Sequence, residues 1–180
     1  MGYAGSCQIF ETFSKCLHWL VSQDQDSNNL DHYLDDFFFV GRPHTHECAD
    51  VMASFSKMCN SLSVPIADDK TEGPTTSMEY LGLLIDTDKM MVKIPTEKLN
   101  KLLEEIKMVA FAKKVTLKQL QSLCGLLSFC TRALPSGRAF HRRLFMAMSK
   151  AHRPFHFIRV NKVFEDLLVW KYFLENFNGH

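Results

Sequence analysis

The sequence of 180 residues predicts an α+β fold. Apolar residues recur at helical spacing near its beginning, strand-like runs follow, and only helical spacing is found after Pro95. We therefore expect helices with an antiparallel sheet over residues 1–94, an all-helical unit over 95–149, and a last segment over 150–180. An apolar fraction of 46% with 23% charged residues is typical of a globular chain.

The first part of the chain predicts two helices around a hairpin. Helical spacing marks residues 6–21, a polar, turn-prone loop follows at 22–29, and a second helix is expected over 45–62. The residues flanking Asp35 and Asp36 have strand composition, which predicts a hairpin with both aspartates at its turn. The apolar faces of the helices are Ile9, Phe10, Phe13, Cys16, Leu17 and Leu20 in the first, and Cys48, Ala49, Met52, Phe55, Cys59 and Leu62 in the second.

The middle of the chain predicts turns and short strands. Residues 68–74 form a charged turn that contains a Gly-Pro pair. Residues 78–94 predict two short strands joined by a turn at 86–88.

Beyond Pro95 the sequence predicts helices. The first is marked by Leu99, Leu102, Leu103 and Ile106. Thr116 and Gln119 predict a capping box that opens the second helix, which Pro135 ends.

A third helix is expected over residues 136–149, with its arginines directed outward. Residues 150–160 are expected to be irregular, and a last helix is expected to begin near Asn161, with Phe164, Leu167, Leu168 and Trp170 on it.

The stretch HYLDDFFFVG, residues 32–41, places two adjacent carboxylates among apolar strand residues. A buried carboxylate is costly unless it is paired or bound to a cation. The pair is either an ordinary Asx-type turn or a cation site on a hairpin tip. Enzymes that transfer nucleotides hold two divalent metal ions with several carboxylates, and the second interpretation indicates that chemistry.

Charge is strongly segregated along the chain. Residues 1–105 carry eight Lys/Arg and seventeen Asp/Glu, whereas residues 106–164 carry twelve Lys/Arg and no acid. Such a segment is typical of a polyanion-binding surface and favours nucleic acid as the partner over helices whose lysines merely keep them soluble. The candidates for contact with the nucleic-acid backbone are Lys113, Lys114, Lys118, Arg138, Arg142 and Arg143.

Other function classes receive little support. No apolar run is long enough to span a membrane and the N-terminus lacks the pattern of a secretory signal, so an intracellular location, cytoplasmic or nuclear, is expected. Six cysteines without a CxxC pair are interpreted as reduced, buried thiols. His44, His46 and Cys48 would not converge on a helix, so they do not predict a zinc site.

Five blocks of the sequence resemble reverse transcriptases, in that family's order. Residues 2–19 resemble its Gly-containing turn and following helix, and YLDD (33–36) resembles the YxDD signature. Residues 65–74 resemble a later palm segment, and residues 79–86 resemble the primer-grip hairpin. Residues 113–144 resemble the thumb and connection, and their GRAF-x-RRL stretch is similar to that of DIRS-type tyrosine-recombinase retrotransposons.

The resemblance implies a partial palm at 1–94, a helical thumb at 95–149, and at 150–180 the start of a connection toward a ribonuclease H domain. It implies an RNA-directed DNA polymerase that binds an RNA or DNA primer–template and a dNTP. Asp35 and Asp36 would bind Mg²⁺ or Mn²⁺, and Lys70 would be a general acid for the leaving pyrophosphate. The other implied residues are Gly5, Gln8, Phe10 and Tyr33, which brace nucleotide and template, and Tyr80, Leu81 and Gly82 of the primer grip.

In that family a third metal-binding aspartate and the fingers precede the block that begins at Gly2. No other acidic residue here has a matching position, so polymerase activity is expected only with the remainder of a longer polyprotein. Two alternatives stay open: a domesticated or remnant module that binds nucleic acid without catalysis, and a globular interaction domain with a fortuitous YxDD.

Overall fold

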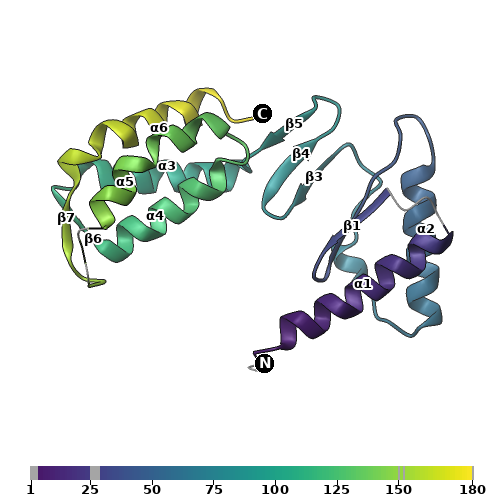
Figure 1. The fold of residues 1–180 in the computed structure, drawn as a ribbon. Helices are drawn as coiled ribbons and strands as arrows, with labels where there is room; N and C mark the ends of the chain where they lie inside the picture. The colour runs from purple at the N-terminus through teal and green to yellow at the C-terminus, as the bar shows by residue number, and fades with distance from the viewer. Residues whose placement is uncertain (1–3, 25–28, 150, 152, 180) are drawn as a thin grey trace. The chain divides into compact units, whose positions relative to one another are not determined.

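The computed structural model of the chain describes residues 4–24, 29–149, 151 and 153–179. The chain forms two compact units, Met1–Thr75 and Thr76–His180, each with its own hydrophobic core. Both combine helices with antiparallel strands, which confirms the predicted α+β fold (Figure 1). Residues 1–3, 25–28, 150, 152 and 180 lie outside the described residues. They include parts of the predicted first block (2–19), first loop (22–29) and last segment (150–180).

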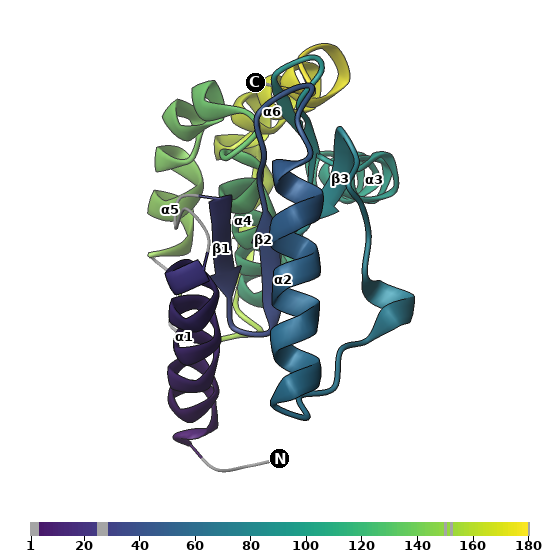
Figure 2. The same ribbon diagram turned by 90° about the vertical axis from the view of Figure 1, so that its right-hand side faces the viewer.

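The first unit holds a hairpin against two helices (Figure 2). Strands β1 (Leu30–Tyr33) and β2 (Asp36–Phe39) pair antiparallel. Helix α1 (Ser6–Asp24) packs on β1 and on α2 (Glu47–Ser61), which also contacts β2. These elements confirm the predicted helices and hairpin. The buried core consists of Leu17, Val21, Leu30, Val51, Phe55 and Cys59.

Of the predicted apolar face of α1, only Leu17 is buried and Leu20 is half-buried. Leu17 is 3% exposed, but Ile9 is 64% exposed and Phe10 and Phe13 are also exposed. A helix of 19 residues is about 28 Å long, whereas strands of four residues span about 13 Å. The helix therefore extends beyond the hairpin. Cys7 and Cys16 on this helix are exposed, contrary to the prediction of buried thiols.

Three strands form the first part of the second unit, where the periodicity predicted two. A short 3-10 helix, η2 (Asp68–Lys70), precedes them in the chain. Strands β3 (Ser77–Tyr80), β4 (Leu83–Asp86) and β5 (Met91–Lys93) form one antiparallel sheet. The additional turn arises because Leu81 and Gly82 adopt positive φ angles of 47° and 80°, which reverse the chain within two residues.

The division between the units lies at Thr75–Thr76 and not near Pro95 as predicted. Leu83 of β4 and Ile94 belong to the same core as the helices that follow. The side-chain amide of Asn178 also bonds to the backbone N–H and C=O of Ile94, both at 2.9 Å. The sheet is thus tied to the helical part by contacts that the local change in periodicity does not reveal.

Four helices surround the core of the second unit: α3 (Thr96–Phe111), α4 (Leu117–Cys130), α5 (Arg142–Met148) and α6 (Phe164–Asn176). The capping box at the start of α4 is confirmed, since the Thr116 and Gln119 side chains each bond to the other residue's backbone N–H. The fully buried side chains of this core include Ile106, Leu120, Leu123, Leu127, Leu144, Leu167, Trp170 and Leu174.

This part of the chain is not all-helical as predicted. Strand β6 (Lys114–Thr116) pairs with β7 (Phe157–Arg159), which lies within the segment expected to be irregular. Each strand has three residues and directs one apolar side chain inward, Val115 or Ile158. Alternation over three residues is too short to be recognised in a sequence.

The third predicted helix is replaced by two shorter elements. Residues Pro135–Phe140 form a 3-10 helix, η3, and α5 begins only at Arg142. A further 3-10 turn, η4 (Val160–Lys162), precedes α6. A Cβ atom added to Gly137 would lie 2.2 Å from the Trp170 ring, so η3 approaches α6 at a distance that only glycine allows.

This contact predicts a large difference between two glycine substitutions. Gly137→Ala should destabilise the chain by about 2 kcal/mol or more, because the indole is fully buried and cannot move away. Gly125→Ala is the matched control, since a Cβ there meets no atom within 4 Å in the described structure. Alanine favours the helix, so this variant should gain roughly 0.5 kcal/mol. Urea denaturation of both variants measures the difference, and equal midpoints would contradict the Gly137–Trp170 contact.

Candidate functional site

Asp35 and Asp36 lie at the tip of the β1–β2 hairpin. Leu34 and Asp35 form a two-residue turn between Tyr33 and Asp36, which pair across the strands. Leu34 has a φ of 55°, in the left-handed region that favours glycine. Both aspartates are exposed, so the cost of burying two carboxylates does not arise.

Aromatic contacts hold the hairpin below its tip. The ring of Phe37 lies 4.5 Å from that of Phe55 on α2, and Phe39 lies 5.4 Å from the same ring. His32 stacks on Phe37 with 5.5 Å between ring centroids. The turn therefore projects from a packed base.

A polar cluster between α1 and β1 was not predicted from the sequence. The Nδ1 atoms of His18 on α1 and His32 on β1 are 2.8 Å apart, so one donates to the other. The Nε2 atom of His32 lies 3.6 Å from a carboxylate oxygen of Glu11. Burial, followed by the neighbouring His32, lowers the pKa of His18 and favours its neutral form. The alternation of Leu30 and His32 along β1 was the available sign that His32 faces the core.

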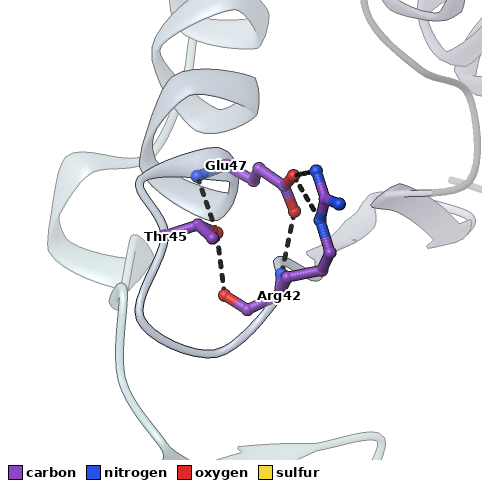
Figure 3. Close-up of polar contacts among 3 residues, drawn as sticks. All are labelled: Arg42, Thr45 and Glu47. Carbon is purple, nitrogen blue, oxygen red and sulfur yellow. Dashed lines mark hydrogen bonds and ion pairs between the residues drawn. The ribbon is translucent and has the colours of Figure 1, made fainter.

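The loop after β2 is closed by Arg42, Thr45 and Glu47 (Figure 3). The backbone N–H and the Nε of Arg42 donate to Glu47 at 2.9 and 2.6 Å, and the Thr45 hydroxyl donates to the Arg42 carbonyl at 2.8 Å. These bonds from Arg42 lower the pKa of Glu47 to about 2. A Cβ on Gly41 would lie 2.5 Å from the Cys48 backbone nitrogen, so the start of α2 packs closely against this loop.

The carboxylates of the hairpin do not form a complete metal site. Within the described part of the chain, no group of three His, Cys, Asp or Glu side chains is placed to hold a metal ion. Two-metal sites need several carboxylates, and among the described residues Asp35 and Asp36 are the pair at the tip. The donor set therefore does not fit a two-metal centre by itself.

The other predicted site residues fall in both units. Gly5 precedes α1, Gln8 and Phe10 are exposed on it, and Tyr33 is 58% exposed at the end of β1. Lys70 is exposed at the end of η2. Tyr80, Leu81 and Gly82 belong to the second unit, where the Lys98 ammonium pairs with Glu79 and donates to the Gly82 carbonyl at 3.4 Å.

Most cations of the acid-free segment lack an acidic partner. Among the described residues of 106–164, only Lys107 and Arg143 form ion pairs, with Glu104 in one case and with Glu165 and Asp166 in the other. The other described cations of this segment are exposed and include the predicted backbone contacts Lys113, Lys114, Lys118, Arg138 and Arg142.

Arg143, the remaining predicted backbone contact, is already paired with two acids, with which a phosphate would have to compete. Its Nε lies 3.1 and 2.9 Å from the two carboxylate oxygens of Asp166, which is 2% exposed, and its Nη1 lies 3.0 Å from Glu165. The hydrogen bond to Glu165 and the charge of Asp166 raise the pKa of Arg143. Both acids lie just beyond the acid-free segment, at positions 165 and 166.

Comparison with solved structures identifies a similar fold. The structure of the foamy viral protease-reverse transcriptase dRH in complex with ds DNA superposes with a TM-score of 0.74 and 18% sequence identity, over 97% of this chain and 28% of that one. The fold is reverse-transcriptase-like. The chain spans about a quarter of that protein's length. Comparisons with protein-family models and with curated proteins give no match.

At this identity the likeness establishes the fold alone. In the reverse-transcriptase-like fold seen here, the Asp35–Asp36 hairpin lies in the first unit and the exposed cations lie in the second. None of the described helices is long and apolar enough to cross a membrane.

The Arg143 ion pairs predict unequal effects of two adjacent substitutions. Arg143→Ala should lower the melting temperature by about 3–8 °C, because it leaves the buried Asp166 carboxylate unpaired. Arg142→Ala removes an exposed neighbour with the same charge and should change it by about 1 °C or less. Adding Asp166→Leu to Arg143→Ala should restore part of the loss. Equal melting temperatures for the two single variants, measured by circular dichroism, would contradict this pairing.

Proposed function

We propose that the chain is the YxDD-bearing palm and thumb part of an RNA-directed DNA polymerase derived from a retrotransposon. The observation that carries the proposal is an Asp-Asp pair at the tip of a hairpin, Asp35 in its two-residue turn and Asp36 at the start of β2, within a reverse-transcriptase-like fold. The GRAFHRRL stretch at 137–144 favours DIRS-type elements.

The proposed metal ligands are Asp35 and Asp36, with Mg²⁺ or Mn²⁺ as the ion. Exposed carboxylates are suitable ligands for these hard cations, and bound metal ions would supply charge stabilisation to phosphoryl transfer. Since the two side chains do not complete a two-metal centre, the proposal requires a further carboxylate beyond this pair.

The other residues of the first unit have proposed roles around the nucleotide. Gly5, Gln8, Phe10 and Tyr33 brace the nucleotide and template, and Lys70 is the general acid for pyrophosphate. Exposure of Lys70 leaves its ammonium accessible to a triphosphate.

In the second unit, the turn formed by Tyr80, Leu81 and Gly82 acts as the primer grip. The exposed cations contact the backbone of the primer–template, and double-stranded DNA in the foamy viral complex supports a duplex as ligand. The second candidate function is a module that binds nucleic acid without catalysis, which the incomplete carboxylate set favours.

Metal binding distinguishes these two functions. With primer–template and dNTP present, Mn²⁺ should bind at Asp35 and Asp36 with a Kd of about 1 mM or weaker. Asp35→Asn/Asp36→Asn should abolish that binding, as measured by electron paramagnetic resonance. The matched control is Asp68→Asn/Asp69→Asn, another exposed pair with the same charge, which should retain it. Unchanged Mn²⁺ binding in Asp35→Asn/Asp36→Asn would contradict the polymerase assignment.

In the same samples the isolated chain should not extend a primer on an RNA template, because two carboxylates hold two metal ions too weakly. Templated products that Asp35→Ala abolishes would show instead that residues 1–180 are sufficient for catalysis.

Duplex binding should weaken as the salt concentration rises, and Arg138 and Arg142 should contribute to this dependence. Each phosphate that is neutralised contributes about −0.9 to the slope of log K against log salt. Arg138→Gln/Arg142→Gln should therefore flatten the slope by about two units, independent of base sequence. Lys57→Gln/Lys101→Gln removes the same charge elsewhere and should leave the slope nearly unchanged. Equal slopes for the two double variants in fluorescence anisotropy would exclude phosphate contact by these arginines.

A further inference from the structure

The outer face of the β6–β7 ladder gathers positive charge. Lys114 lies directly opposite Arg159, and Thr116 lies opposite Phe157. Val115, which is 5% exposed, and Ile158 face the core, so alternation directs the other four side chains outward. Figure 1 shows the two strands side by side at one end of the helices of this unit.

This arrangement is electrostatically unfavourable in the free chain. Like charges directly opposite each other in an antiparallel pair destabilise it. Lys113 adds a third cation next to Lys114, and none of the three has an acidic partner among the described residues. A bound anion would remove this repulsion.

The same face carries a hollow and exposed aromatic rings. An open, shallow depression of about 500 Å³ is lined by Lys113, Lys114 and Arg159 together with Phe111, Asn161 and Phe164. Phe111 is 80% exposed and Phe157, two residues from Arg159 on the outer face, is 64% exposed. Cations beside exposed rings suit a ligand that carries both phosphates and accessible bases.

We propose that this face binds single-stranded nucleic acid, with phosphates at Lys113, Lys114 and Arg159 and unpaired bases stacked on Phe111 and Phe157. A duplex would meet the cations but not the rings, because its bases are already stacked on one another. Stacking on phenylalanine is tolerant of sequence, so no base preference is expected. The inference rests on the proposed function in that Lys113 and Lys114 bind nucleic acid, and it specifies a single strand as their ligand. It adds Arg159, Phe111 and Phe157, which duplex binding does not require.

The test uses fluorescein-labelled oligo(dT) of 15 nucleotides and the full 180-residue chain. Lys114→Gln/Arg159→Gln should weaken binding at least about tenfold, while the melting temperature stays equal or rises because the repulsion is relieved. Phe111→Ala should weaken it roughly fivefold or more without changing the melting temperature. Lys57→Gln/Lys101→Gln is the control with the same change in charge, and it should bind nearly as tightly as the wild type.

Three results would overturn the inference. The first is equal oligo(dT) affinity in Lys114→Gln/Arg159→Gln and the control double variant. The second is an effect of the cations without an effect of Phe111→Ala, which would mean contact with phosphate alone. The third is competition by polyglutamate as effective as that by unlabelled oligo(dT), which would indicate a surface for any polyanion.

A duplex titration of the same proteins separates this inference from the proposed function. If the wild type fails to bind duplex but oligo(dT) binding depends on Lys114, Arg159 and Phe111, the proposed primer–template role fails and the inference stands. If duplex binding depends on Arg138 and Arg142 but oligo(dT) binding does not depend on Lys114, Arg159 and Phe111, the inference fails and the proposed primer–template role stands.

Discussion

The contact between Phe37 of β2 and Phe55 of α2 holds the Asp35–Asp36 turn in place. A hairpin of two four-residue strands is at best marginally stable in water, so its geometry depends on the helices that cover it. The positive φ of Leu34 is unfavourable for a branched side chain, and packing at the base of the hairpin has to maintain it. The carboxylates are thus exposed on a hairpin tip whose conformation depends on the packing of Phe37, the residue that follows them.

Packing in the second unit explains much of the GRAFHRRL stretch. Gly137 allows the close approach of Trp170, and His141 stacks on the same indole with 5.1 Å between ring centroids. Arg143 neutralises the buried Asp166 of α6. These three residues attach η3 and α5 to α6, and they leave Arg138 and Arg142 exposed. The stretch therefore stabilises the packing of η3 and α5 on α6 and also places positive charge on the surface.

Features that depend on local sequence patterns could be predicted, whereas features that depend on contacts between distant residues could not. Long amphipathic helices, the capping box at Thr116 and the hairpin at Asp35 follow from local patterns, and the structure contains them. The short strands β6 and β7 and the division at Thr75 depend on contacts between distant segments. In the candidate site, the His18–His32 contact and the ion pair of Arg143 with Asp166 join residues 14 and 23 positions apart, beyond the reach of sequence spacing.

The distribution of acids decides which cations stay available. The first two acids after the acid-free segment, Glu165 and Asp166, both pair with Arg143. The cations at β6–β7 and at η3 are left to repel their neighbours, and repulsion between exposed charges acts over about 8 Å at physiological salt. A ligand that binds the folded chain and not the unfolded one stabilises it by mass action. An anionic partner would therefore also raise the stability of this unit, an effect that charges serving only solubility would not produce.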